Sequence, residues 1–415
     1  MTRTHLERII TIVLVLSIAS AASAQSQDEA SRAKALSTAR DQKAETIAPP
    51  TRSLTERVLH WYDNRESNLS WNGFHLNLGN FSGGAGLAAG IGFTRPAIGS
   101  PIVDPHQANR IDLDLSAGRS ILGYQRLSAR VDVLNVASAP ITLSLLWRDD
   151  QMPQEDFYGL GQDSSESHRV SYRLDTKDVT AAIEWKPFRR VYVGGAVAHL
   201  APVLGRGTDQ RFPSIEATFD PSTAPGLAGL PKFIRADAML GFDWRDNASH
   251  PRSGGHYQVT GSRFDGQGDD GTDFERVNVH LQQIVPLGNR YRRLELRAQA
   301  ALTGADSLAR VPVIYMPYVG GPSTLRGFAT SRFQDRQAVS MTAEYQWEAW
   351  WALDAAVFVD TGQVQHTVGD FALRSFVTNY GFGLRLHSNS KFLARLDLAY
   401  GREGFRPLLG FKYGF

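Results

Sequence analysis

Residues 339–347 read Val-Ser-Met-Thr-Ala-Glu-Tyr-Gln-Trp, and in this stretch apolar and polar side chains alternate one by one. The apolar positions are Val339, Met341, Ala343, Tyr345 and Trp347, and the polar positions are Ser340, Thr342, Glu344 and Gln346. Successive side chains of a β-strand point to opposite faces of the sheet. The stretch therefore predicts a strand with one apolar face and one polar face.

The same period of two recurs along much of the chain, including residues 84–93, 291–302 and 392–400. These runs approach the roughly 9 to 11 residues that a tilted membrane strand needs, whereas strands of a soluble β-sandwich are usually shorter. Aromatic residues cluster at the ends of the runs, as interfacial girdles do, at Trp347, Trp350, Trp351, Tyr400 and Tyr413. The pattern favours strands that cross a membrane.

A strand in lipid needs a hydrogen-bonded neighbour on each side, because no water is present to satisfy its backbone groups. We therefore predict an all-β fold, a closed antiparallel transmembrane β-barrel over residues 84–415. About 16 candidate strands are found, an even number as in bacterial single-chain barrels. Their centres lie near residues 89, 114, 130, 144, 172, 183, 194, 239, 260, 280, 297, 342, 356, 382, 396 and 411. Short and long connections alternate back from the C-terminus, but residues 149–167 form a long one where a short turn is expected.

The composition excludes several classes of protein. The 415 residues include 44 Lys and Arg against 42 Asp and Glu, so no basic field favours a nucleic-acid partner. The chain has no Cys, which excludes disulfides, Cys-ligated zinc and thiol nucleophiles. Its apolar content of 42% argues against a bundle of membrane-spanning helices.

The N-terminus has the three parts of a secretory signal peptide. Arg3 and Arg8 are basic, residues 9–18 are apolar, and Ala22-Ser23-Ala24 offers a small-residue cleavage site. Residues 1–24 are therefore predicted to direct export and to be removed. We expect the mature chain to begin at Gln25, outside the cytoplasm.

Residues 25–83 form a polar N-terminal segment with one short amphipathic helix. Leu54, Val58, Trp61 and Tyr62 fall on one helical face. Packing of this face against the protein itself is the favoured interpretation. The alternative is a helix at a membrane surface or inside a pore.

The longest connection, residues 304–336, contains Tyr-Val-Gly-Gly-Pro-Ser-Thr-Leu-Arg-Gly-Phe at positions 318–328. Here the chain resembles the bacterial surface antigen family, the barrel superfamily of BamA and TamA, whose inward-folded external loop has an Arg-Gly-Phe/Tyr tip. The matching positions are Gly320, Gly321, Leu325, Arg326, Gly327 and Phe328. Similar motifs occur at residues 157–161, 243–254, 343–345 and 358–362. The resemblance covers residues 84–415 and implies an outer-membrane barrel with an internal lid loop.

Charge gives the tip of this loop a role of its own. By the period of two, Glu344 and Asp360 share the polar faces of their strands, so both carboxylates should face the lumen. A guanidinium in a confined lumen needs hydrogen-bonded carboxylate partners, which makes Arg326 the expected ion-pair partner of Asp360 and of Glu344. The alternative is a solvated Arg326 and two ordinary lumen acids. The resemblance implies the same latch.

The last strand ends in an aromatic residue, like the signal that the barrel assembly machinery reads in the resembling family. Alternate positions of this strand are apolar or aromatic, namely Leu409, Phe411, Tyr413 and Phe415. The seam between the first and last strands is a second candidate site, because the glycine face of residues 84–92 offers few side-chain contacts. In the resembling family, sideways opening of this seam is linked to insertion of client barrels. The alternative is that the glycines relieve crowding where the lid packs.

The resemblance implies a factor for insertion or passage of proteins at the outer membrane. Its partners would be outer-membrane lipid, the assembly machinery for its own insertion, and client proteins or a separate periplasmic partner, since residues 25–83 offer no room for a POTRA domain. The alternatives are a passive or gated channel and, less favoured, a lipid-active enzyme. No catalytic motif, metal site or cofactor is predicted, because the G-x-S-x-G and H-E-x-x-H motifs are absent and the histidines are scattered across different strands and loops.

Overall fold

The structure is a computed structural model, and it describes residues 73–79, 81, 84–98, 110–268, 272–305, 311–387 and 392–411. The expected signal peptide, the expected helix at residues 54–62, and Tyr413 and Phe415 lie outside the described residues. The chain divides into residues 1–61 and 62–415, and every described residue belongs to the second unit.

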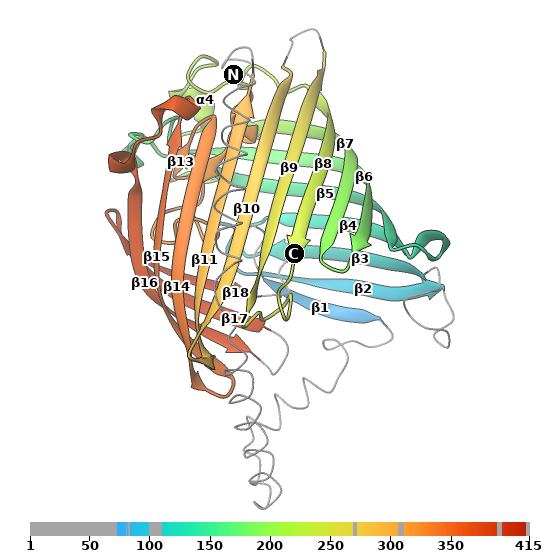
Figure 1. The fold of residues 1–415 in the computed structure, drawn as a ribbon. Helices are drawn as coiled ribbons and strands as arrows, with labels where there is room; N and C mark the ends of the chain where they lie inside the picture. Colours follow the sequence, from blue (N-terminus) through green and yellow to red (C-terminus); the bar gives the residue numbers. More distant parts are fainter. Residues whose placement is uncertain are drawn as a thin grey trace, which may run out of the picture. The chain divides into compact units, whose positions relative to one another are not determined.

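The described residues form one 16-stranded antiparallel sheet that curves into the wall of a barrel (Figure 1). Each strand pairs with the next along the chain, except that β11 pairs with β14. The strands are β1 (Phe74–Gly79), β2 (Ala88–Ile98), β3 (Arg110–Ser120), β4 (Gln125–Leu134), β5 (Ile141–Phe157), β6 (Val170–Phe188), β7 (Val191–Arg206), β8 (Lys232–Asp243), β9 (Gly254–Gln267), β10 (Phe274–Leu287), β11 (Asn289–Gly304), β14 (Gln337–Trp350), β15 (Leu353–Gln365), β16 (Val377–His387), β17 (Phe392–Gly401) and β18 (Gly404–Phe411). This confirms the all-β antiparallel barrel predicted from the alternation. Among the helices of the described residues, none has the length and apolar character to cross a membrane.

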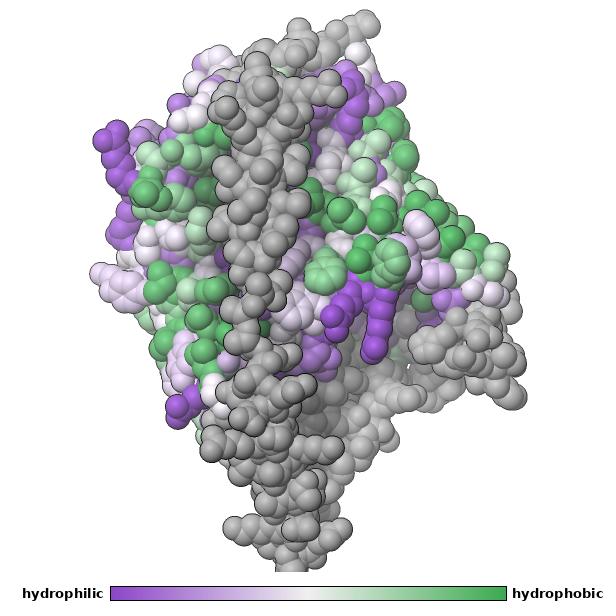
Figure 2. Space-filling model, viewed as in Figure 1, coloured by the Kyte–Doolittle hydropathy of each residue, from purple (hydrophilic) through white to green (hydrophobic). Residues whose placement is uncertain are grey.

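The alternation that predicts the strands also separates the two faces of the wall. In β14, Met341 and Ala343 are exposed, whereas Thr342, Glu344 and Gln346 are buried. Large apolar side chains are exposed along the outer faces of most other strands, and Figure 2 shows them spread over the visible wall. An exposed apolar band of this kind fits contact with acyl chains.

Two strands differ from those expected. The wall begins at Phe74 with β1, earlier than residue 84, where the predicted barrel starts. The predicted strands near residues 172 and 183 are wrong as separate elements, because they form the single 19-residue strand β6. The two errors compensate in the total of 16. The same two errors explain why the long connection at residues 149–167 is out of place in the predicted alternation. With β1 added at the start, residues 158–169 between β5 and β6 lie on the side of the barrel that carries the long loops.

Within the part of the chain that the structure describes, β1 and β18 are the edge strands of the sheet. They approach each other (Figure 1), but no hydrogen-bonded ladder joins them within the described parts of the chain. The seam hypothesis takes the glycine strand as the first strand of the barrel, which is wrong. That strand, β2, is not an edge, because β1 pairs with it from Phe74↔Phe93 to Gly79↔Ala88. Gly92 makes room for a neighbour on β1, since a Cβ added there would lie 2.2 Å from Nε2 of His75.

The connection between β11 and β14, residues 305–336, is the lid loop. It contains the short elements η4 (Val313–Tyr315), β12 (Tyr318–Val319) and β13 (Phe333–Gln334). Val311 and Met316, in its first half, pack with buried side chains of β7 to β10, such as Phe233 and Phe264. Its second half packs on β14, β15 and β16. The lid loop thus crosses the interior of the barrel.

Candidate functional site

Arg326, at the tip of the lid loop, binds two carboxylates of the barrel wall. Its Nε and Nη2 donate to Oδ2 and Oδ1 of Asp360 on β15 at 2.9 and 2.8 Å, and its Nη1 donates to Oε2 of Glu344 on β14 at 2.6 Å. The backbone N–H of Arg326 also donates to Asp360 Oδ2, at 3.3 Å. All three side chains are almost fully buried. The structure therefore brings together the three residues of the expected latch.

The wall holds both carboxylates in place. Asp360 accepts hydrogen bonds from Thr342 Oγ1 and Asn379 Nδ2, each at 2.9 Å. Glu344 Oε1 accepts from Arg385 Nη2 at 2.9 Å and from Gln346 Nε2 at 2.8 Å. Because these donors come from the same faces of β14 and β16, the carboxylates are oriented toward Arg326 by the sheet itself.

The charges of the latch extend to a third acid. Asp397 on β17 lies 2.5 Å from Arg385 Nη1 and 3.6 Å from Arg326 Nη1. Burial disfavours the charged guanidinium of Arg326, but the hydrogen bonds with Asp360 and the charges of Glu344, Asp360 and Asp397 outweigh it and raise its pKa above the ordinary value. Arg326 therefore stays charged, and its lid position depends on these acids.

Packing leaves little room around the tip. The Cζ atom of Arg326 lies 3.3 Å from the centroid of the Phe358 ring, in cation–π contact. A Cβ added at Gly327 would lie 2.6 Å from Cβ of Asn379, so the backbone of the tip passes directly over the wall. Phe328 is fully buried and packs near Gly401 of β17.

The two glycines before the tip adopt backbone angles that favour glycine. Gly320 has a φ of 125° and Gly321 a φ of 88°. Gly321 N–H donates to the carbonyls of Leu325 and Phe328, both at 3.1 Å, which closes the tip into a compact turn. Leu325 is fully buried beneath it.

A second anchor holds the lid loop at Arg332, which the sequence analysis does not single out. Its Nε donates to Oε1 of Glu403 in the β17–β18 turn at 2.8 Å. Its Nη1 and Nη2 donate to the Oγ and backbone carbonyl of Ser164 at 3.0 and 2.8 Å. Arg332 is buried, and it joins the lid loop to two connections far apart in the sequence.

The Phe-Tyr-Gly-Leu-Gly motif at residues 157–161 lies against the same part of the lid loop. Gly161 N–H donates to the carbonyl of Gln334 at 2.8 Å, and Leu160 forms an isolated parallel bridge with the same residue. Tyr158 is buried, and its ring centroid lies 5.0 Å from Cζ of Arg332. The motif is thus part of the lid contact.

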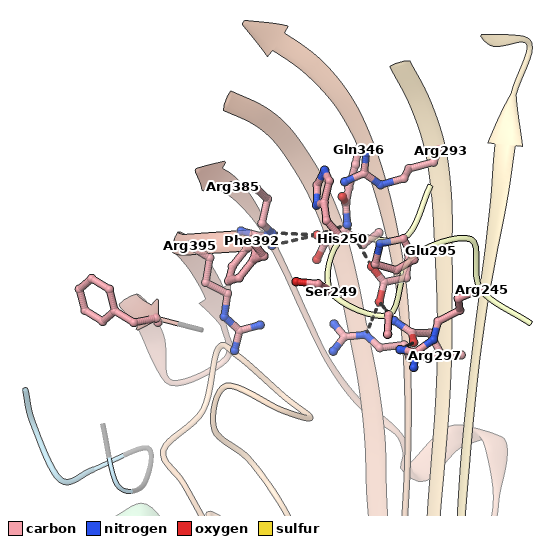
Figure 3. A pocket seen from close by; sticks show the side chains of 16 residues that line it. Arg245, Ser249, His250, Arg293, Glu295, Arg297, Gln346, Arg385, Phe392 and Arg395 are labelled. Carbon is pink, nitrogen blue, oxygen red and sulfur yellow. Dashed lines mark hydrogen bonds and ion pairs between the residues drawn. The ribbon is translucent and has the colours of Figure 1, made fainter. Parts of the chain in front are cut away.

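A polar cavity of about 330 Å³ borders the latch. Figure 3 shows Arg385 and Arg395 on one side of it and Arg245, Glu295 and Arg297 on the other. Gln346 Nε2 bridges Glu344 and Glu295, at 2.8 and 3.0 Å. A second positive charge beside Glu344, in addition to Arg326, comes from Arg385, which no sequence motif indicates.

Of the predicted C-terminal signal, Leu409 is half exposed on the outer face of β18, and Phe411 is the last residue of that strand. Tyr413 and Phe415 lie outside the described residues. The role of these four residues as an assembly signal stays a prediction.

A family model described as the Omp85 superfamily domain matches residues 157–411, more than half of the chain. The chain belongs to the Omp85 superfamily. This confirms the resemblance read from the lid motif. The Omp85 barrel fold implies that the protein is located in the outer membrane of a Gram-negative cell.

A solved structure supports the same fold for this Omp85 barrel. The barrel is similar to BamA from Haemophilus ducreyi lacking POTRA domains 1–3, with a TM-score of 0.56 and 13% sequence identity over 82% of this chain and 70% of that one. CdiB from Escherichia coli is similar with a TM-score of 0.49 and 14% identity, over 84% of this chain and 63% of that one. No curated protein matches the sequence significantly.

Proposed function

We propose that this Omp85 barrel aids the insertion or passage of proteins at the outer membrane and has no enzymatic role. The observation that carries the proposal is the latched lid loop. Arg326 is held by Asp360 and Glu344 in the interior, so the lumen holds a folded plug where an open pore would hold water. A plug held by a few charged contacts suits a protein that opens when a partner binds.

The edges of the barrel support the same proposal. A strand edge without a ladder presents unpaired N–H and C=O groups, which can pair with another chain. Within the described residues no ladder joins β1 and β18, so both edges are candidates for pairing with a client strand. We propose unfolded outer-membrane proteins as clients, with lipid around the wall and a separate periplasmic partner for delivery.

Inventory of the outer membrane tests the assembly role. We expect deletion of the chain to lower the amounts of several outer-membrane barrel proteins, measured by quantitative mass spectrometry of isolated membranes. Expression of the wild type should restore them. An unchanged inventory together with slower uptake of small solutes would instead favour the alternative, a gated channel.

Crosslinking tests the seam directly, because the chain has no Cys of its own. One Cys is placed in β1 and one in β18, and oxidation should abolish complementation while reduction restores it. A matched control pair at Leu396 and Leu409 joins β17 and β18, which are already register partners, and should complement in both states. A crosslinked seam that still complements fully would contradict opening at this edge.

Conductance separates the plugged barrel from an open pore. Wild-type protein in a planar bilayer should show small, intermittent currents, because the lid loop obstructs the lumen. A large steady current from the wild type would contradict the plug and favour a passive channel.

A further inference from the structure

The end of the barrel near the cavity holds a cluster of two imidazoles and one carboxylate. His250 belongs to the turn between β8 and β9, Asp354 to the start of β15, and His387 to the end of β16. Their three candidate ligand atoms all lie within 4.8 Å of one another, and all three residues are buried. The two imidazole rings stack with centroids 4.3 Å apart. These residues are 33 or more positions apart in the sequence, which is why no motif reveals them.

The distances from the carboxylate oxygens to the ring nitrogens are close to those between neighbouring ligands of a single metal ion. Zn–N and Zn–O bonds of about 2.1 Å in a tetrahedral site place neighbouring ligand atoms about 3.4 Å apart. Here His387 Nε2 lies 3.2 Å from Asp354 Oδ1, and His250 Nε2 lies 3.5 Å from Asp354 Oδ2. Both oxygens of the carboxylate thus face a ring nitrogen.

His250 Nε2 has an unmet hydrogen-bonding requirement. The side chain is about nineteen-twentieths buried, with an exposure of 5%, and Nε2 has no hydrogen-bond partner in the structure. A buried polar atom without a partner is costly, so such an atom in a native protein calls for an explanation. A metal ion at the cluster would supply the missing partner.

The backbone around the cluster is fixed before any ion binds. Asn247 Oδ1 accepts the N–H groups of Ser249 and His250 at 2.7 and 3.1 Å, which shapes the turn that carries the imidazole. His387 N–H donates to the carbonyl of Ala352 at 2.9 Å, next to the start of β15. Hydrogen bonds of the backbone therefore shape both segments that carry the imidazoles.

We propose that His250, Asp354 and His387 form a binding site for one divalent transition-metal ion, with Zn²⁺ as the best fit to two imidazole nitrogens and the carboxylate of Asp354. Three protein ligands leave a coordination position for water. Because β9 and β15 are separated in the sheet by β10, β11 and β14, the ion would clip the β8–β9 turn to a distant part of the wall.

Arg293 provides a prediction that only a metal site makes. Its Nη2 donates to Asp354 Oδ2 at 2.8 Å, and its Nη1 has no hydrogen-bond partner in the structure (Figure 3 shows Arg293 beside His250). A guanidinium so close to the carboxylate competes with a bound cation. Removal of its charge should therefore tighten metal binding, which a cluster with only a structural role does not predict.

Titration of the full-length protein in detergent with Zn²⁺, against a chromogenic chelator, tests the site. We expect one Zn²⁺ per chain for the wild type, at least tenfold weaker binding for His250→Gln, and unchanged binding for His256→Gln, a matched control on β9. Arg293→Gln should bind several-fold more tightly. Co²⁺ in place of Zn²⁺ should give the visible absorption of a tetrahedral site in the wild type and lose it in His250→Gln.

Heat-modifiable migration in gels shows whether each variant is folded before it is titrated. His250→Gln is the deciding variant, because His250 lies in a turn outside the strands, whereas Asp354 and His387 lie within β15 and β16. The proposal is overturned if folded wild type binds no Zn²⁺ at micromolar concentrations. Equal binding by His250→Gln and His256→Gln would also overturn it, because it would show adventitious binding elsewhere.

Discussion

At the scale of single residues, the latch depends on the shape of the guanidinium as well as its charge. Arg326 presents a planar fork that binds Asp360 through two nitrogens while a third reaches Glu344. A lysine ammonium is a compact point charge and cannot form this bidentate contact. The surrounding Thr342 and Asn379 leave Asp360 with no need of water.

Substitution of Arg326 should free the lid loop. Arg326→Ala leaves buried carboxylates without their partner, a change that typically costs about 3–5 kcal/mol, and Arg326→Lys should recover only part of it. We expect rapid chymotrypsin cleavage after Leu325 or Phe328 in both variants and larger single-channel currents, because both side chains are buried while the tip is latched. Arg211→Ala, at an exposed loop site, is the control and should behave as wild type. A digestion pattern identical to wild type would contradict the latch.

Gly327 should tolerate no side chain. A methyl group there would meet Cβ of Asn379 at 2.6 Å, and overpacking of this kind costs about 1–3 kcal/mol. We expect Gly327→Ala to loosen the tip, seen as faster amide hydrogen exchange at residues 325–328. Gly304→Ala is the matched control, because an added Cβ at Gly304 meets nothing within 4 Å. Equal exchange in both variants would show that the tip does not press on the wall.

At the scale of elements, the lid loop is held at two separate places. Arg326 ties its tip to β14 and β15, and Arg332 ties its return segment to the β17–β18 turn and to Ser164. The two anchors are separated by the tight turn at Phe328 and by the residue Ser331, whose φ of 56° is unusual for a non-glycine residue. The anchors can therefore be removed one at a time.

Arg332→Ala should release only the return segment. The variant loses the contacts with Glu403 and Ser164 but keeps the Arg326 latch, so residues 329–336 should exchange amide hydrogens faster while residues 320–327 stay protected. Hydrogen exchange with mass spectrometry measures both segments in one sample. Glu403→Gln keeps an acceptor without its charge and should have a smaller effect. Faster exchange across the whole lid loop would show that the anchors act as one unit.

The strands show what sequence can predict and where it fails. Alternation identifies β14 and β15 because each residue faces either lipid or the interior. It fails in β6, where the outward positions change from the charged Arg173 and Lys177 to the apolar Val179 and Ile183. A strand of 19 residues is longer than a bilayer requires, so part of its outer face needs no apolar side chains.

Some residues of the candidate site can also be predicted from the sequence, and others cannot. Arg326, Glu344 and Asp360 can be predicted because a loop arginine in a confined lumen needs acids, and the polar faces of two strands supply them. Arg385 and Arg332 cannot be predicted, because their partners Asp397 and Glu403 depend on which strands meet across the interior. The pairing of His250 with His387 depends on the closure of the wall for the same reason.

At the scale of the whole molecule, the two faces of the barrel wall lie in different environments. Val357 and Val359 on β15 are exposed on the outer face, whereas their neighbours Phe358 and Asp360 are buried on the inner face. The same strand therefore carries both the lipid contact and the latch. A change to one face should leave the other intact.

A charge on the outer face should weaken the barrel in a bilayer. An arginine near the middle of the lipid-facing band costs about 2–4 kcal/mol, so Val357→Arg should lower the free energy of unfolding in liposomes by that amount. Leu373→Arg is the control, because Leu373 is 92% exposed in the connection between β15 and β16. Denaturant titration monitored by tryptophan fluorescence measures both. Equal stability of the two variants would contradict contact of Val357 with lipid.

The depth of the latch also decides which conditions can open it. Mobile ions screen charges that they can approach, over a Debye length of about 8 Å at physiological ionic strength. Mobile ions should weaken a surface ion pair such as Arg110–Asp112, because the side chain of Arg110 is 50% exposed. They have no access to Arg326, whose side chain is 1% exposed. Changes in external salinity should therefore leave the plug shut, and release requires a molecule that competes for the carboxylates or moves the wall that holds them.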